Sequence, residues 1–410
     1  MLIVNIKQIA GITDGGTGCL SGGEMLTGMA TMDDAWILLR DGLIHSFGSM
    51  SEMPQVGSDD VVDARGGMVL PAFCDSHTHI VYAGSRHGEF IDKINGLSYE
   101  DIARRGGGIL NSADLLARTS EDELYAQARL RAEEMMAKGT GAMEIKSGYG
   151  LSTSAELKML RVIARLKEDL PAKVCATFLG AHAVGRSYAG RQSEYVEMLV
   201  SEMLPAVASE GLADFVDVFC DQGFFTVNET ARILEAAAKY GMRPKIHANE
   251  LAVSGGVQVG VRYGAVSVDH LERMGAEEIS ILKDSTTIPT MLPGASFFLG
   301  MPYAPAREAI AAGLPVALAS DYNPGSSPSG DMRMVMALGC IKMRLLPTEA
   351  LAAITVNGAA AMDLRPRYGS IFPGAVANLL LTVAVPSLDF IPYAYTSPFI
   401  RRVILQGKYI

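Results

Sequence analysis

Short apolar runs separated by helical patterns dominate the chain from about residue 66 to 365. Between several of these runs, apolar residues recur at the spacing of an amphipathic helix, as in 120–138, 154–169 and 228–240. Such alternation of strands and helices predicts an α/β fold with a parallel sheet. Eight strands are expected, the number that a (β/α)8 TIM barrel needs, at 67–77, 142–146, 173–179, 215–219, 244–247, 265–269, 287–290 and 316–320.

The two ends of the chain follow another pattern. Segments 35–39 and 42–48 are typical of strands bounded by Gly- and Asp-rich turns, and segments 378–383 and 402–405 are strand-like again. We therefore expect a composite small β-sandwich domain built from residues 1–65 and 366–410. The barrel domain would then span residues 66–365.

Composition and charge exclude several classes of protein. The chain of 410 residues is 49% hydrophobic, which is too apolar for a disordered protein. The 35 Lys and Arg against 45 Asp and Glu give a net charge of −10, and without a long basic block we expect no nucleic-acid partner. No signal-like or membrane-spanning run occurs, so no membrane partner is expected. The five scattered cysteines form no Cys-x-x-Cys pair and favour a reducing, cytoplasmic compartment.

His77-Thr78-His79 is the first chemical signal. Residues two apart on a strand point to the same side, so the two imidazoles can converge on one metal ion. They follow the first expected strand, at the C-terminal face where such barrels place their active sites. An isolated pair of this kind can also be two hydrogen-bonding histidines at a strand end.

His247-Ala248-Asn249-Glu250 is the second signal, at the end of the fifth expected strand. His247 can supply a third metal ligand, and Glu250 can reach a metal-activated water and move its protons. This spacing also occurs on ordinary helices. His270 and Asp321 end the sixth and eighth expected strands and suit the binding or polarising of a water, although a lone Asp there is usually a cap.

The order of these motifs resembles the amidohydrolase superfamily. The resemblance implies that His270 orients the water or the developing oxyanion, and that one metal ion, zinc or iron, is bound by His77, His79, His247 and Asp321. Binuclear members bridge two metals with a carboxylated lysine from the fourth strand. Here Lys146 ends the second of the eight expected strands and His182 follows the third. Neither lies on the fourth strand, so one metal is favoured over two.

Further segments narrow the resemblance to the imidazolonepropionase family. They lie at 76–86, 106–109, 146–151, 177–183 and 320–326. The resemblance covers nearly the whole chain and implies hydrolysis of the cyclic amide of 4-imidazolone-5-propanoate to N-formimidoyl-L-glutamate in histidine degradation. Metal-activated water would attack the ring carbonyl, with the catalytic roles carried by Glu250 as general acid and base, His270 and Asp321.

The same resemblance implies the substrate contacts. Arg86 would pair its planar guanidinium with the propanoate. The other implied contacts are Tyr149, His182, Glu250, Asn323, Gly325 and Ser326. Without the motifs, Arg86 would be a solvated charge, Tyr149 a packing aromatic and His182 a satisfied core histidine, and the Asn-Pro-Gly segment would be simple turn chemistry.

Two other functions stay open. A mononuclear deaminase similar to cytosine or guanine deaminases would share the metal ligands and release ammonia, although Arg86 and Tyr149 argue against it. A non-catalytic barrel similar to dihydropyrimidinase-related proteins would have lost metal ligands, and all of those expected are present here. A homodimer is the expected assembly. The triplet Gly106-Gly107-Gly108 lacks the Lys-Ser/Thr of a phosphate loop and is expected near the barrel mouth.

Overall fold

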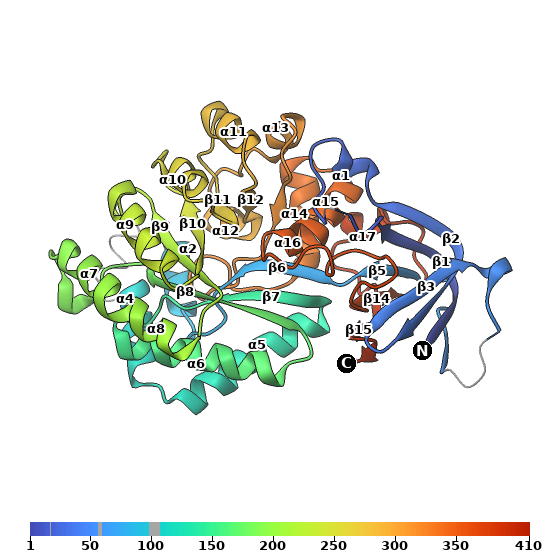
Figure 1. Cartoon of the computed structure of the whole chain (residues 1–410), viewed down its shortest axis with the longest axis horizontal. Helices are drawn as coiled ribbons and strands as arrows, with labels where there is room; N and C mark the ends of the chain where they lie inside the picture. Colours follow the sequence, from blue (N-terminus) through green and yellow to red (C-terminus); the bar gives the residue numbers. More distant parts are fainter. Residues whose placement is uncertain (17, 56–59, 98–106) are drawn as a thin grey trace.

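A parallel sheet of eight strands, bent into a barrel, forms the centre of the larger part of the molecule (Figure 1). The computed structural model describes residues 1–16, 18–55, 60–97 and 107–410. The strands pair in chain order, and each coincides with an expected strand. They are β6 (Phe73–Thr78), β7 (Thr140–Lys146), β8 (Lys173–Ala181), β9 (Phe215–Cys220), β10 (Arg243–Ala248), β11 (Ser267–His270), β12 (Ile288–Met291) and β13 (Ala317–Leu318).

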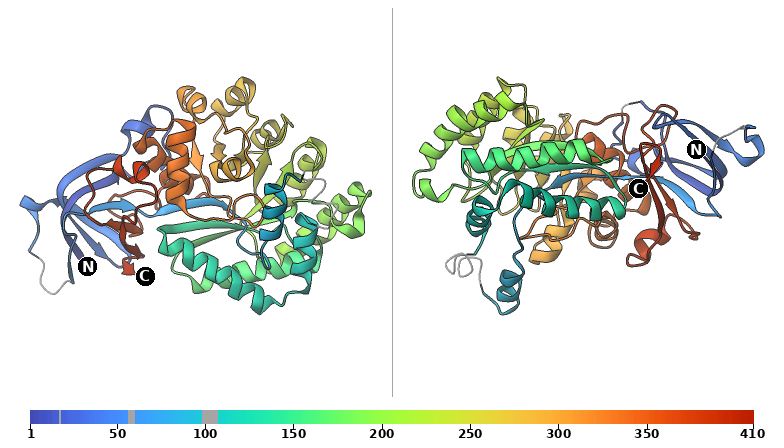
Figure 2. Two further views of the ribbon diagram at one scale, coloured as in Figure 1. Left: turned by 180° about the vertical axis from the view of Figure 1, so that it is seen from behind. Right: turned by 90° about the horizontal axis from the view of Figure 1, so that it is seen from below.

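Helices cover the outside of this barrel in all views (Figures 1 and 2). The three predicted helices are confirmed as α5 (Glu121–Ala137), α6 (Thr153–Asp169) and α9 (Val227–Ala238). In the described ranges, no helix is both long and apolar enough to span a bilayer. The other α-helices are α1 (Glu24–Thr27), α2 (His87–Ile94), α4 (Ile109–Arg118), α7 (Gln192–Met198), α8 (Leu204–Glu210), α10 (Gly256–Arg262), α11 (Ala276–Lys283), α12 (Pro293–Leu299), α13 (Ala306–Ala311), α14 (Met332–Met343), α15 (Pro347–Ile354), α16 (Val356–Ala360) and α17 (Phe390–Tyr393).

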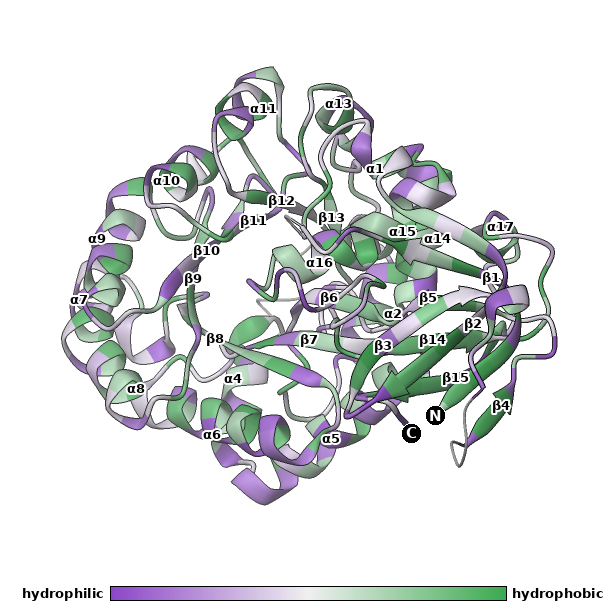
Figure 3. Cartoon of the chain, turned by 45° about the vertical axis from the view of Figure 1, so that its right-hand side comes forward, coloured by the Kyte–Doolittle hydropathy of each residue, from purple (hydrophilic) through white to green (hydrophobic). Residues whose placement is uncertain are grey.

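Strands from both ends of the chain form a second sheet, beside which the two termini lie (Figure 2). An isolated antiparallel bridge pairs Leu43 with Val376 of the C-terminal segment. Several strands of this sheet are strongly hydrophobic (Figure 3). The domain boundaries themselves stay a prediction. The strands are β1 (Leu2–Ile12), β2 (Ala30–Arg40), β3 (Leu43–Ser49), β4 (Val61–Asp63), β5 (Met68–Pro71), β14 (Leu379–Thr382), β15 (Ile400–Leu405) and β16 (Lys408–Tyr409).

The apolar run 67–77, expected as one strand, divides between the two sheets. β5 pairs with β1 and β14 of the small sheet, whereas β6 pairs with β7 of the barrel. The change of partner occurs at Ala72, whose N–H donates to Asn378, while the N–H of Phe73 donates to Gly139. One continuous segment therefore joins the two sheets directly, without a linker between them.

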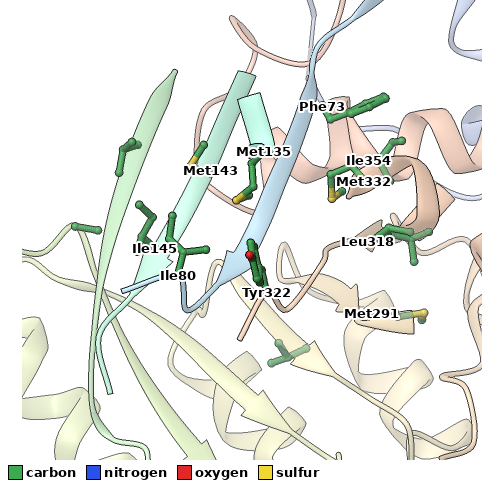
Figure 4. Packing of buried hydrophobic residues seen from close by; sticks show 14 of the residues in the cluster. Phe73, Ile80, Met135, Met143, Ile145, Met291, Leu318, Tyr322, Met332 and Ile354 are labelled. Atoms are coloured by element: carbon green, nitrogen blue, oxygen red, sulfur yellow. The ribbon is translucent and has the colours of Figure 1, made fainter. Parts of the chain in front are cut away.

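Aliphatic and sulfur-containing side chains fill the layer between the barrel strands and the surrounding helices. In Figure 4, Met135 of α5 lies beside Met143 and Ile145 of β7, with Ile80 and Tyr322 next to them. These side chains are almost completely buried. A parallel sheet enclosed on both faces requires such continuous apolar runs, which accounts for the high hydrophobic content of the chain.

The barrel closes between its first and last strands. β13 is only two residues long, and the seam continues beyond it, where Asp321 N–H donates to His77 O (3.0 Å) and His79 N–H donates to Tyr322 O (2.9 Å). The Asp75 carboxylate accepts the N–H and the hydroxyl of Ser320, at 3.0 and 2.5 Å. This seam places the end of the eighth strand beside the two histidines of the first.

Candidate metal centre and active site

The four predicted metal ligands converge at the C-terminal ends of the barrel strands. His77 Nε2 lies 3.2 Å from His79 Nε2, and Asp321 Oδ1 lies 3.6 and 3.5 Å from these two nitrogens. Ring nitrogens of His77, His79 and His247 all lie within 4.8 Å of one another. All four side chains are buried. Three imidazoles and one carboxylate facing a common point form the donor set of a zinc-type site.

Carboxylates lie directly behind two of the histidines. Asp269 Oδ2 lies 2.7 Å from His77 Nδ1, and Asp217 Oδ2 lies 3.0 Å from His247 Nδ1. This arrangement leaves the Nε2 atoms available as ligands. His247 Nε2 is buried and has no hydrogen-bond partner among the described residues. Because an unpaired buried nitrogen is costly, the residues present fit a bound cation.

The first-strand histidines are neutral at ordinary pH. Burial lowers the pKa of His77 well below its usual value, and the nearby Lys146 ammonium lowers it further. Burial also lowers the pKa of His79, with His182 and His247 adding to the effect. Neutral imidazoles are the form in which histidine binds a metal.

A network of buried charges lies under the ligands. Lys146 Nζ donates to Glu144 Oε1 (2.5 Å) and Asp217 Oδ2 (2.8 Å) and lies 3.6 Å from Asp269 Oδ2. Lys245 also donates to Glu144. Burial alone would lower the pKa of Lys146, but Asp217 and Glu144 outweigh it and raise that pKa. Lys146 is thus held as an ammonium ion by carboxylates, which supports the expectation of one metal over two.

Glu250 and His270 lie together beside the ligands. Their closest side-chain atoms, Glu250 Oε2 and His270 Nε2, are 3.7 Å apart, and Glu272 Oε1 lies 3.6 Å from His270 Nδ1. Burial, with Glu272 and Asp321, raises the pKa of Glu250 to about 7. Burial would lower the pKa of His270, but Glu250 and Glu272 outweigh it and raise that pKa to about 10. Glu250 can therefore take up and release a proton near neutral pH, while His270 presents a cationic imidazole.

Backbone strain is concentrated in the same loops. The φ angles are positive at Asn249 (53°), His270 (81°), Leu271 (71°) and Asp321 (53°), although none of these is glycine. Such conformations cost free energy and persist where the surrounding structure enforces them. Here they turn the chain sharply after β10, β11 and β13, directly at the candidate catalytic side chains.

A cavity of about 770 Å³ opens above the ligands. His79, His247, His270 and Asp321 line its floor. All of the predicted substrate contacts also line this cavity: Arg86, Tyr149, His182, Glu250, Asn323, Gly325 and Ser326. The structure thus brings these residues together in one place, and their contacts with a substrate stay a prediction.

His182 and Tyr149 form one wall of the cavity. The ring of His182 stacks on His79, with centroids 5.4 Å apart and 19° between the planes. Its Nδ1 lies 3.0 Å from the carbonyl oxygen of Gly148, and burial lowers the pKa of His182 to about 3. His182 is therefore a neutral, oriented ring that can face a planar ligand.

The Asn323 loop is held by its own side chains. Asn323 Oδ1 accepts the N–H groups of Gly325 (2.7 Å) and Ser326 (2.8 Å), and its Nδ2 donates to Asp321 O (2.8 Å). Ser326 Oγ also lies 3.3 Å from Asp321 Oδ2. These are the bonds of an Asn-containing turn, which is sufficient to explain an asparagine at position 323. The same bonds hold the loop next to Asp321, a predicted metal ligand.

Several residues of the site have no assigned role in the sequence analysis. Asp217, Asp269 and Glu272 lie beside the site histidines. Lys93 lines the cavity, and Glu89 pairs with Arg86. In the sequence, Asp217 and Asp269 differ from their neighbours only as charged residues inside apolar strands. Charged residues are rarely buried there unless their charge is paired. Nothing in the local sequence of Glu89 or Lys93 distinguishes them from surface charges.

The glycine triplet at 106–108 and His87 lie close to the cavity residues in the sequence. Gly106 lies outside the described residues, and the N–H of Gly108 donates to Glu89 Oε1 at 2.9 Å. The neighbouring Ile109 lines the cavity, which agrees with a position near the barrel mouth. His87 begins α2, where its Nδ1 lies 2.7 Å from Ser85 Oγ.

Comparison with known proteins relates the chain to hydrolases. The model of the amidohydrolase family matches residues 68–409. A protein of Flavobacterium johnsoniae named imidazolonepropionase is 51% identical over 100% of this chain and 99% of its own. Those of Christiangramia forsetii (50%, all of both chains) and Thermoanaerobacter pseudethanolicus (39%, 98% and 96%) carry the same name.

Solved structures with the same fold are much more distant in sequence. A triazine hydrolase variant superposes with a TM-score of 0.75 at 17% identity, covering 100% of this chain and 94% of that one. The 5-methylcytosine deaminase of Klebsiella pneumoniae gives a TM-score of 0.74 at 18% identity, with 100% and 98% covered. At this level of identity the likeness shows the fold alone.

Proposed function

The chain belongs to the amidohydrolase family and, within it, to the imidazolonepropionases, and from that premise we propose which residues carry its reaction. The reaction is hydrolysis of the ring of 4-imidazolone-5-propanoate to N-formimidoyl-L-glutamate in histidine degradation. The observation that carries the assignment is the convergence of four ligands beside Glu250 and His270 at the floor of one cavity.

Members of this family depend on a metal ion, and in this chain we assign one ion, zinc or iron, to His77, His79, His247 and Asp321. When bound, the ion supplies a Lewis acid that polarises the ring carbonyl and makes water more acidic. Nitrogen and oxygen donors accept several divalent ions, so availability selects between the two metals. A homodimer remains the expected assembly.

Glu250 moves the protons of the reaction. Its carboxylate accepts a proton from the attacking water as the new C–O bond forms at the ring carbonyl. The same proton is then delivered to the ring nitrogen as the C–N bond breaks. The raised pKa of Glu250, about 7, suits both directions of transfer near neutral pH. His270, held cationic by Glu250 and Glu272, donates to the carbonyl oxygen as negative charge develops there.

The remaining cavity residues orient the substrate. Arg86 pairs with the propanoate, Tyr149 and His182 contact the ring, and the loop of Asn323, Gly325 and Ser326 donates to the polar ends of the substrate. The deaminase alternative has less support, because the relatives at about 50% identity over the full chain are imidazolonepropionases.

Replacing Glu250 by Gln tests this mechanism. The variant keeps the shape of the side chain but cannot accept a proton, so turnover should fall by about 100-fold or more. Loss of the substrate's ultraviolet absorbance measures turnover, and metal analysis should give the same metal content per chain as the wild type.

Glu277→Gln is the matched control, since Glu277 is exposed at the start of α11. It should keep full activity. Undiminished turnover by Glu250→Gln would remove Glu250 from the mechanism. Ammonia release from nucleobases by the wild type, without ring opening of imidazolone propanoate, would favour the deaminase.

A further inference from the structure

Arg86, just before α2, and Lys93, on α2, line the cavity, and Glu89 of the same helix pairs with Arg86. Arg86 Nε and Nη2 both donate to Glu89 Oε2, at 2.9 and 2.5 Å. The other oxygen of Glu89 accepts the N–H of Gly108. Arg86 and Glu89 are 12% exposed, so water screens their pairing only partly. The charge of Arg86 is therefore largely compensated before any substrate arrives.

Lys93, in the last turn of α2, is the second cation that lines the cavity. Its Nζ donates to the carbonyl oxygen of Gly325 at 3.1 Å and lies 5.4 Å from the centre of the Phe298 ring. A Cβ on Gly325 would collide with the Arg86 guanidinium. Both cations thus lie against the same residue of the substrate loop.

The charges around the cavity show why a second cation matters. Among the described residues that line the cavity, the basic side chains of Arg and Lys are Arg86 and Lys93, and the acidic side chains are Glu250 and Asp321. The whole chain carries a net charge of −10. Because Glu89 neutralises the charge of Arg86, the net charge of Arg86, Glu89 and Lys93 together is one positive charge, carried by Lys93. One substrate carboxylate would balance it.

We propose that Lys93 binds the propanoate of the substrate together with Arg86 and sets the preference of the enzyme for a carboxylate over a neutral side arm. This inference rests on the proposed function for the identity of the substrate. Lys93 is half-buried, and burial and Arg86 lower its pKa. An incoming carboxylate would favour the charged form of Lys93 and replace part of its lost hydration.

Binding of imidazole-4-propanoate tests the inference without turnover, since this probe keeps the ring and the propanoate but lacks the ring carbonyl. Calorimetry would compare it with its neutral amide on the metal-loaded enzyme. Lys93→Met should weaken binding of the propanoate about tenfold, the usual value of one charged hydrogen bond. Lys93→Arg should retain most of the affinity, and binding of the amide should not change.

Lys342→Met is the matched control, because Lys342 is an exposed lysine in the last turn of α14 and does not line the cavity. It removes the same charge from the chain and should bind the propanoate like the wild type. The inference is overturned if Lys93→Met binds the propanoate with unchanged affinity, or if it loses the propanoate and the amide equally.

Hydrolysis of 4-imidazolone-5-propanoate by the wild type is measured alongside. In Lys93→Met, KM for this substrate should rise about tenfold with kcat nearly unchanged, because the contact binds the ground state and the transition state alike. Absence of hydrolysis by the wild type would overturn the proposed function alone, since the calorimetric comparison of propanoate and amide still decides the role of Lys93.

Discussion

At the scale of single residues, Gly325 shows how a missing side chain positions a charge. Its place in an Asn-Pro-Gly segment indicates a turn, and the structure adds a second reason for glycine. An added Cβ would meet the Arg86 guanidinium, with Cζ only 2.9 Å away. The guanidinium is the end of a flexible side chain, so it can move aside without unfolding the loop.

Gly325→Ala should therefore impair substrate binding more than stability. Displacement of the Arg86 guanidinium is expected to lower kcat/KM about tenfold, mainly through KM. The free energy of unfolding should change by less than about 1 kcal/mol. Steady-state kinetics and urea unfolding measure the two effects.

Gly88→Ala is the control for an added methyl group, because a Cβ on Gly88 of α2 would meet no atom within 4 Å. It should leave KM unchanged. If Gly325→Ala and Gly88→Ala have the same KM, the close approach of Arg86 to Gly325 does not affect substrate binding.

At the scale of elements, the seam between β6 and β13 determines whether the site is assembled. The eighth strand is too short to close the barrel by ladder hydrogen bonds alone. Side chains complete the closure, since Asp75 accepts two hydrogen bonds from Ser320, and Ser320 Oγ accepts the N–H of Tyr322. Asp321 follows directly, so closure of the barrel and the position of this ligand depend on the same few contacts.

Ser320→Ala should weaken both the closure of the barrel and the positioning of Asp321. It leaves a buried oxygen of Asp75 and the N–H of Tyr322 without their partner, which costs about 2 kcal/mol of unfolding free energy. We also expect faster loss of metal to a chelator. Ser280→Ala, on the exposed face of α11, is the control and should change stability by less than about 0.5 kcal/mol. Equal effects of the two variants would show that the seam does not depend on the hydroxyl.

At the scale of the whole molecule, the metal site ties together distant parts of one barrel. Its proposed ligands come from β6, β10 and the loop after β13. A bound ion therefore holds the first, fifth and last strands in register. The small sheet shares this framework, since β5 runs directly into β6.

Removing the metal should lower stability and abolish turnover together. A metal ion whose free concentration is about 100 times its dissociation constant stabilises the folded state by about 2.7 kcal/mol. In a chain of this size, that corresponds to a fall in melting temperature of about 3 °C on chelation. Differential scanning calorimetry with and without chelator checks the shift, and re-addition of zinc or iron should restore melting and activity. Identical melting curves for both forms would argue against a shared ion.

The order of the strands and the candidate metal ligands could be predicted from the sequence alone. Apolar runs of strand length alternate with helical patterns, and the covalent chain fixes His77 two residues from His79 on one side of a strand. Charged residues at strand ends could also be recognised, because parallel strands present their C-terminal ends at one face. Local periodicity and motif order are properties of the chain alone.

Which distant side chains meet became clear only in the folded barrel. Asp269 behind His77, Asp217 behind His247, and Lys93 beside Gly325 are contacts between residues far apart in the sequence. These pairs exist because the barrel closes and its loops fold over one mouth. The charge states of Glu250 and His270 then follow from burial and from neighbouring charges, which are set in space and leave no trace in local sequence spacing.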